Sequence, residues 1–179
     1  AGWIDFHGTE IKGEEKLTLC DNEYKVKWKN LNHHESNILP KPKIMGFDIE
    51  VNSHNPSKFP DAKEPGDKVF QISCVVARDG DSSDDYVSFL LSLGDPDQEI
   101  TGKHVKIIKY KTEASLIEGF ADLIRKENVN IVVGYNILGF DIPYLIDRSK
   151  YNLCSDFDKQ GFHKYNHANE KTIKWSSSA

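Results

Sequence analysis

Hydrophobic and polar positions alternate along several short stretches of the chain, and this alternation predicts β-strands. The expected strands cover residues 43–51, 69–77, 86–93, 105–110 and 131–134. A long segment rich in Pro and Gly, residues 52–67, is typical of a loop, and residues 78–81 form a hairpin-turn signal. The middle of the chain is therefore expected to be built around a sheet.

Two stretches show the longer period of helices. Ile117, Phe120, Ala121 and Ile124 recur at the spacing of one helical face, and Thr112 is a suitable N-cap for a helix over residues 113–128. A second helix is expected to begin between residues 139 and 145, just after the last strand. Strands and helices in this order predict a mixed sheet with helices packed on it.

The first forty residues have a different character. Residues 16–20 and 24–28 alternate as half-buried strands do, and Pro40 and Pro42 then restrict the backbone. We expect residues 1–40 to be the end of a β-rich N-terminal domain and residues 41–179 to form the second domain. The polar residues 156–179 are expected to be a surface insertion.

Candidate chemistry lies on the first strand of that second domain. Asp48 and Glu50 are two residues apart, so their carboxylates project from the same strand face and repel each other. Hard divalent cations such as Mg²⁺ or Mn²⁺ would relieve that repulsion. Taken alone, however, an Asp-x-Glu pair in a strand is more typical of an exposed polar face.

A third acidic residue changes this interpretation. Asp141 lies at the expected strand-to-helix corner, where a helix N-cap is the simplest explanation and Pro143 is tolerated in the first turn. A cap needs only the aspartate, however. It does not account for Gly134, Tyr135 and Asn136 upstream or for Phe140 beside it.

Together these residues resemble a known family. Phe47-Asp48-Ile49-Glu50 resembles the first motif, F-D-I-E, of the proofreading 3′→5′ exonuclease domain of family B DNA polymerases. The stretch from Gly134-Tyr135-Asn136 to Phe140-Asp141 resembles its second motif, G-Y-N-x-x-x-F-D. The resemblance extends over residues 44–145, and it is strongest to delta-type enzymes and to the polymerases of large DNA viruses. It implies a ribonuclease-H-like α/β fold.

The resemblance also implies roles for single residues. Asp48 would bridge two Mg²⁺ or Mn²⁺ ions, Glu50 would bind the ion that activates water and orient that water, and Asp141 would support the second ion. Asn136 and Phe140 would contact the substrate, the single-stranded 3′ end of DNA. From the residues alone, Asn136 could equally cap the strand end, and a Phe just before a helix is more often part of a core.

One element of the family pattern is missing. The third motif, Y-x-x-x-D, supplies a further metal-binding Asp and a Tyr that orients water, but Tyr144, Tyr151 and Tyr165 are followed at the fourth position by Arg148, Ser155 and Asn169. We therefore expect a part of a longer polymerase, truncated before its third motif and inactive or nearly so in isolation. Its partners would be the remaining polymerase domains. The alternatives are a catalytically silent nuclease-like module and, less favoured, an exonuclease acting on RNA.

Charge, cysteine content and the length of apolar stretches limit the partners and compartments that can be expected. The net charge of −5 and the pI of about 5.8 lack the basic character of a duplex-DNA binder, so the chain alone should bind DNA weakly. The three cysteines form no C-x-x-C pair, which fits a reducing intracellular compartment and leaves the nucleus and a viral factory both open. No apolar stretch approaches the length of a membrane span, so no membrane partner is expected.

Two groups of histidines are possible metal ligands. His33, His34 and Glu35 are neighbours in an expected loop and cannot easily converge on one ion, so a solvated turn is the preferred interpretation. His163 and His167 have helical spacing, but nearby Gly and Asn residues favour simple exposure. Neither group predicts a site.

Overall fold

The computed structural model describes residues 2–96, 105–154 and 157, and contacts divide these residues into two compact units. The division falls between Ile38 and Leu39. The assignment of residues 1–40 to an N-terminal domain stays a prediction. The expected surface insertion, with His163 and His167, lies outside the described residues except at Phe157.

The first unit is a two-stranded antiparallel sheet formed by β1 (Trp3–Glu10) and β2 (Tyr24–His34), with a short 3-10 helix at Gly13–Glu15 between them. The strand predicted at residues 16–20 is wrong. Only Thr18 forms an isolated bridge, and the carboxylate of Glu23 accepts hydrogen bonds from the backbone N–H groups of Leu17 and Thr18, at 3.0 and 2.9 Å.

Strand β2 also extends beyond the predicted residues 24–28, and this corrects the expected loop at His33 and His34. These two residues pair with Ile4 and Trp3 of β1. Consecutive strand residues face opposite sides of a sheet, so their rings point apart. The His34 ring lies 3.0 Å from the Asp5 carboxylate.

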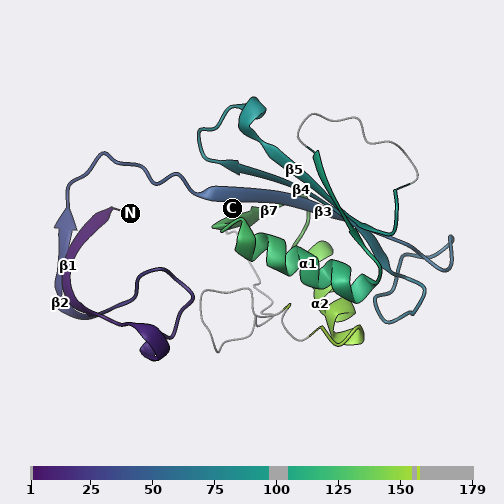
Figure 1. Ribbon diagram of the computed structural model, residues 1–179, viewed down its shortest axis with the longest axis horizontal. Helices are drawn as coiled ribbons and strands as arrows, with labels where there is room; N and C mark the ends of the chain where they lie inside the picture. Colours follow the sequence, from purple (N-terminus) through teal and green to yellow (C-terminus); the bar gives the residue numbers. More distant parts are fainter. Residues whose placement is uncertain (1, 97–104, 155–156, 158–179) are drawn as a thin grey trace, which may run out of the picture. The chain divides into compact units, whose positions relative to one another are not determined.

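The second unit contains a five-stranded mixed sheet in the order β6-β5-β4-β3-β7 (Figure 1). Its strands are β3 (Lys43–Val51), β4 (Val69–Arg78), β5 (Val87–Leu93), β6 (Val105–Tyr110) and β7 (Ile131–Val133). The central strands β3, β4 and β5 are antiparallel, whereas the two outer strands run parallel to their neighbours. The sequence thus predicted every strand of this sheet, with end points that differ by one residue or less.

Two helices, α1 (Glu113–Lys126) and α2 (Asp141–Tyr151), lie on one side of this sheet (Figure 1). The Thr112 hydroxyl accepts a hydrogen bond from the Ser115 backbone N–H at 3.2 Å and caps α1 as predicted. Helix α1 ends two residues before the predicted end, because Asn128 adopts a left-handed backbone with φ of 51°.

The core of this unit fills the space between the sheet and the helices. Along β3, Met45, Phe47 and Ile49 are buried, and the ring of Phe47 lies 5.0 Å from that of Phe120 in α1. Neighbouring positions on the same side of the sheet are also buried, namely Ile72, Cys74 and Val76 of β4 and Phe89 and Leu91 of β5. One sheet face is therefore apolar and covered.

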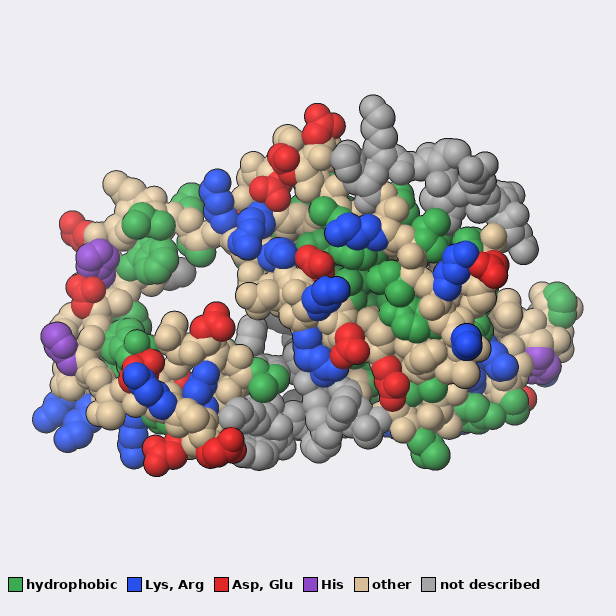
Figure 2. Space-filling model, in the orientation of Figure 1, with side chains coloured by type: hydrophobic (Ala, Val, Ile, Leu, Met, Phe, Trp, Pro, Cys, Tyr) green, Lys and Arg blue, Asp and Glu red, His purple; other side chains and the backbone are tan. Residues whose placement is uncertain are grey.

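Hydrophobic side chains reach the surface between α1 and strands β5 and β6, bordered by Lys and by Asp or Glu (Figure 2). A shallow depression of about 580 Å³ lies there, lined by Phe89, Ile108, Tyr110 and Leu123 with charged residues around them. Within the described ranges, no helix has the length and apolar character needed to cross a membrane.

Candidate active site

Strand β3 presents its two carboxylates on the face that the helices leave open. Asp48 and Glu50 are exposed, whereas the flanking Phe47 and Ile49 are buried, so the alternation of the strand separates acid from core. Opposite them on β4 stand Ser73 and Gln71, which are neutral. Neither of these cross-strand neighbours offers a positive charge to the pair.

The edge of β3 beside these carboxylates is only partly covered. Strand β7 pairs with β3 through three residues and ends at Val133, opposite Gly46. The next residue, Gly134, passes so close to β3 that a Cβ atom there would lie 2.7 Å from the carbonyl oxygen of Phe47 and 2.2 Å from the Ile137 side chain. A glycine is therefore required for this close approach.

A tight turn then leads into α2. Asn136 adopts a left-handed backbone with φ of 52°, and its carbonyl accepts hydrogen bonds from the N–H groups of Gly139 and Phe140 at 2.9 and 3.0 Å. Gly139 leaves room for the Asn136 side chain, since a Cβ atom would lie 2.3 Å from Asn136 Oδ1. Asn136 is exposed and shapes this turn, and contact with a substrate remains a prediction.

Asp141 is the first residue of α2 and not its N-cap, which corrects the simplest interpretation of the sequence. The N-cap is Phe140, and its side chain makes no capping hydrogen bond. The Asp141 carboxylate instead accepts the backbone N–H of Ile49 at 3.2 Å, across 92 positions of the chain. Beyond the end of β7, the Asp141 side chain thus replaces a neighbouring strand as the hydrogen-bond partner of β3. It does so at the residue between Asp48 and Glu50.

The charge of Asp141 is poorly compensated. This residue is only 3% exposed, and burial raises the pKa of its carboxyl group. The negative charge of Asp48 raises this pKa further, while the hydrogen bond from the Ile49 N–H lowers it. Among the described residues, no Lys, Arg or His forms an ion pair with Asp141.

The donor chemistry of this place suits a hard cation, because ionised carboxylate oxygens are the ligands that Mg²⁺ and Mn²⁺ prefer. The negative charge of Asp48 is close enough to contribute to the raised pKa of Asp141. The three carboxylates do not form one cluster, since the described part of the chain contains no group of three His, Cys, Asp or Glu side chains that could hold a metal ion. Metal binding by all three carboxylates therefore remains a prediction.

Aromatic rings lie beside Asp141. Phe140 is half-buried, and its ring lies 5.2 Å from that of Phe59 and 5.3 Å from that of Tyr144. Phe59 belongs to the loop between β3 and β4 and is 76% exposed. Phe59 could not be singled out from the sequence, because a lone aromatic in a loop has no periodic pattern.

Comparisons with known proteins agree with this arrangement. The family model described as DNA polymerase family B, exonuclease domain, matches residues 1–179. The chain is 40% identical over 190 residues to DNA polymerase 120R of Invertebrate iridescent virus 3 and 38% identical over 162 residues to the DNA polymerase catalytic subunit of Saimiriine herpesvirus 2. These matches cover 100% and 88% of this chain but only 16% of each viral protein.

A solved structure supports the fold. The family B DNA polymerase from the archaeon Pyrobaculum calidifontis matches with a TM-score of 0.54 at 23% sequence identity, over 83% of this chain and 15% of that protein. The match confirms the predicted ribonuclease-H-like α/β fold. The viral relatives confirm the predicted resemblance to polymerases of large DNA viruses. The chain therefore belongs to the exonuclease-domain family of family B DNA polymerases.

Proposed function

We propose that this chain is the proofreading 3′→5′ exonuclease region of a longer DNA-directed DNA polymerase and that it hydrolyses the 3′-terminal phosphodiester of a DNA strand. One observation carries the proposal: the buried Asp141 carboxylate is held against β3 beside Asp48 without a positive partner among the described residues. A fold gains little from two repelling carboxylates unless a cation binds between them.

Each acidic residue has a place in this scheme. Asp48 and Asp141 would share the cations, with Asp48 bridging both, and the Ile49 N–H fixes the orientation of the Asp141 carboxylate. Glu50, exposed on the same face as Asp48, would orient the attacking water. Two bound Mg²⁺ or Mn²⁺ ions would supply the activation of water and the stabilisation of the leaving oxygen.

The substrate in this proposal is the single-stranded 3′ end. Phe140 contacts the exposed ring of Phe59, and exposed aromatic rings are suited to stacking on bases. Asn136, which is exposed and precedes Phe140 in the chain, would contact the DNA strand. A mispaired end frays more readily than a paired one, so it would reach this site more often, and editing follows from that difference.

The acidic chain would not hold duplex DNA by itself. Its net charge is −5, whereas binding to DNA depends largely on Lys and Arg contacts to phosphates. We propose that the remaining polymerase domains provide that grip, in keeping with the small share of each viral relative that the chain spans.

A second candidate is a nuclease-like module that no longer catalyses. The lack of a cluster of three metal-ligating side chains among the described residues favours it, because fewer carboxylates bind a divalent ion less well than three. The retained acids on β3 and α2 favour the exonuclease, since a silent module has no use for the uncompensated charge of Asp141.

The test uses the polymerase that we propose contains this chain, with Asp48→Ala and Glu50→Ala introduced together. Digestion of a 5′-labelled single strand in Mn²⁺ should fall by at least about a hundredfold, and incorporation of nucleotides on a primed template should continue at the original rate. The same strand with a blocked 3′ end should resist the unmodified enzyme. Undiminished digestion by the double variant would refute the proposed function.

A further inference from the structure

The guanidinium group of Arg148 in α2 is fully buried and donates four hydrogen bonds. Its Nε donates to Glu113 Oε1 at 2.8 Å, and its Nη2 donates to Glu113 Oε2. Its Nη1 donates to the backbone carbonyls of Ala62 and Glu64, both at 2.9 Å. One side chain therefore joins α2 to the first turn of α1 and to the loop between β3 and β4.

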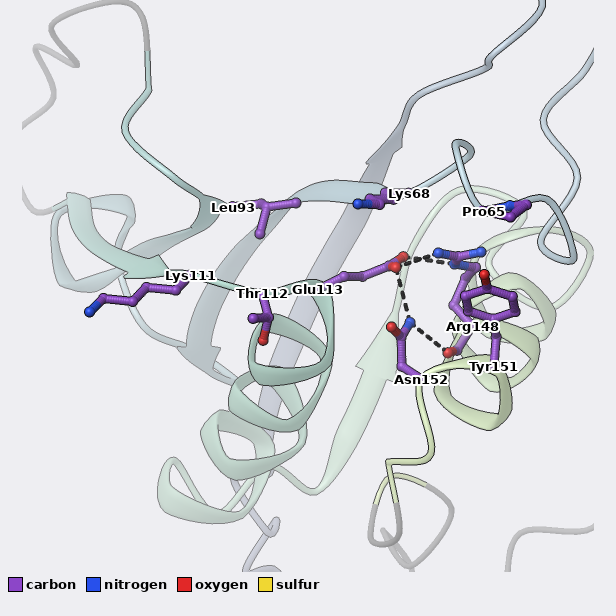
Figure 3. A pocket seen from close by; sticks show the side chains of 9 residues that line it. All are labelled: Pro65, Lys68, Leu93, Lys111, Thr112, Glu113, Arg148, Tyr151 and Asn152. Carbon is purple, nitrogen blue, oxygen red and sulfur yellow. Dashed lines mark hydrogen bonds and ion pairs between the residues drawn. The ribbon is translucent and has the colours of Figure 1, made fainter.

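Glu113 extends the same network (Figure 3). One carboxylate oxygen accepts the Asn152 side-chain amide at 2.9 Å. The other accepts the backbone N–H of Val69, the first residue of β4, also at 2.9 Å. These hydrogen bonds outweigh the effect of burial, which by itself raises the pKa of Glu113, so this pKa lies below its usual value. The pair is therefore ionised at neutral pH.

Arg148 and Asp141 lie on the same side of α2. They are seven residues apart, which is close to two helical turns, and Tyr144 between them also faces the core. The Tyr144 hydroxyl donates to the backbone carbonyl of Asp67 at 2.8 Å, at the end of the same loop. Because a helix is stiff over two turns, anchoring Arg148 fixes the direction in which Asp141 approaches β3.

The anchored loop forms the other border of the proposed site. It directly follows β3, which carries the carboxylates, and its residue Phe59 contacts Phe140. The carbonyls of Ala62 and Glu64 lie three and five positions after Phe59. Arg148 thus holds both the helix that carries Asp141 and the loop that meets Phe140.

Stability alone is a weak reason for this arrangement. Replacing a buried ion pair by apolar side chains of similar volume is often neutral or stabilising, because two charges lose their hydration on burial. A site that must hold groups within about 0.5 Å, in contrast, depends on directional contacts behind it. We propose that Arg148, held by Glu113, is a positioning residue that fixes Asp141 on the Ile49 N–H; its role in metal binding rests on the proposed function.

The test compares the whole chain with the double variant Glu113→Leu/Arg148→Met, which replaces the buried ion pair by apolar groups. The first measurement is hydrogen exchange at the Ile49 amide in EDTA. Exchange at Ile49 should accelerate about tenfold, as expected for the loss of one hydrogen bond. Amides paired between β3 and β4 should keep their protection, and the melting temperature should stay within a few degrees.

Two further variants calibrate this result. Asp141→Leu removes the acceptor itself and gives the full loss of Ile49 protection. Lys43→Met/Glu127→Leu removes another ion pair, 3.2 Å long and joining β3 to the residue after α1, and should leave Ile49 unchanged. Unchanged Ile49 exchange in a folded Glu113→Leu/Arg148→Met chain would overturn the proposal, whatever the metal affinity.

Mn²⁺ affinity, measured by electron paramagnetic resonance, is the second readout. It should fall about 10- to 100-fold in Glu113→Leu/Arg148→Met, the usual effect of losing a group that orients a ligand. The same affinity in this variant as in the unmodified chain would also count against the proposal. An unmodified chain that binds no Mn²⁺ contradicts the proposed function instead, and Ile49 exchange then decides on Arg148 alone.

Discussion

The Asp141 carboxylate accepts the backbone N–H of Ile49 at 3.2 Å, although the two residues are 92 positions apart. This hydrogen bond lies beyond Gly46, where the pairing of β3 with β7 ends. It brings the first turn of α2 to the strand that carries Asp48 and Glu50, and it gives Asp141 a structural task in addition to the proposed catalytic one.

Two substitutions at Asp141 separate these tasks. Asp141→Asn keeps an oxygen acceptor for the Ile49 N–H and removes a buried charge that Asp48 repels, so its melting temperature in EDTA should equal or exceed that of the unmodified chain. Asp141→Leu leaves a buried N–H group without a partner, and it should cost about 1–3 kcal/mol in urea unfolding.

The pH dependence of unfolding in Asp141→Asn tests whether the charge of Asp141 destabilises the folded chain. A raised pKa means that the folded chain binds the proton more tightly than the unfolded chain, so this group lowers stability as the pH rises through its folded pKa. The advantage of Asp141→Asn should therefore be present at pH 7 and vanish in acid. An advantage that grew toward low pH would contradict the charge argument.

Gly134 should tolerate no side chain. In Gly134→Ala the new methyl group would lie 2.7 Å from the Phe47 carbonyl oxygen, and the resulting displacement should cost about 1–3 kcal/mol in thermal or urea unfolding. Gly46→Ala on β3 is the matched control, because its methyl group would lie 3.9 Å from the Val133 side chain, an ordinary contact. Equal stability of the two variants would show that β7 and β3 approach less closely.

Asp67 should govern part of the acid unfolding. Burial raises the pKa of its carboxyl group, but hydrogen bonds from the backbone N–H groups of Asp61 and His54 and from the His54 ring lower this pKa from 3.8 to about 2. The stabilisation is present above pH 3.8 and is lost as the pH falls toward 2. Urea unfolding between pH 5 and pH 2 should therefore show a shallower loss for Asp67→Asn than for the unmodified chain. Asp84→Asn, at an exposed carboxylate, is the control and should keep the original slope.

Periodic patterns account for the parts of the fold that the sequence predicted well. Strand β3 and strand β6 have the predicted bounds, because alternating burial along a strand is written directly in the order of its residues. Residues 16–20 alternate in the same way, yet they form no strand, since Glu23 takes up two of their N–H groups. A pattern of hydrophobic positions cannot show whether the N–H groups of a segment will bond to a neighbouring strand or to a side chain such as that of Glu23.

Contacts between distant residues account for what the sequence did not predict. Asp141 was a plausible cap by position, and only the folded chain shows that its acceptor role serves Ile49 instead. From the sequence, Arg148 is notable only as a mismatch to the third motif. Its partner Glu113 lies 35 positions away, and no local spacing links the two residues. Phe59 is likewise joined to Phe140 only by the path of a loop.

A double-mutant cycle of Mn²⁺ binding shows whether Asp48 and Asp141 share a bound cation. Electron paramagnetic resonance would give the affinity of the unmodified chain, of Asp48→Asn, of Asp141→Asn and of the double variant. Each single substitution should weaken binding more than about tenfold, and the double variant should lose much less than the sum, as expected for ligands of one ion. Unchanged affinity in both single variants would show that the two carboxylates do not bind a common cation.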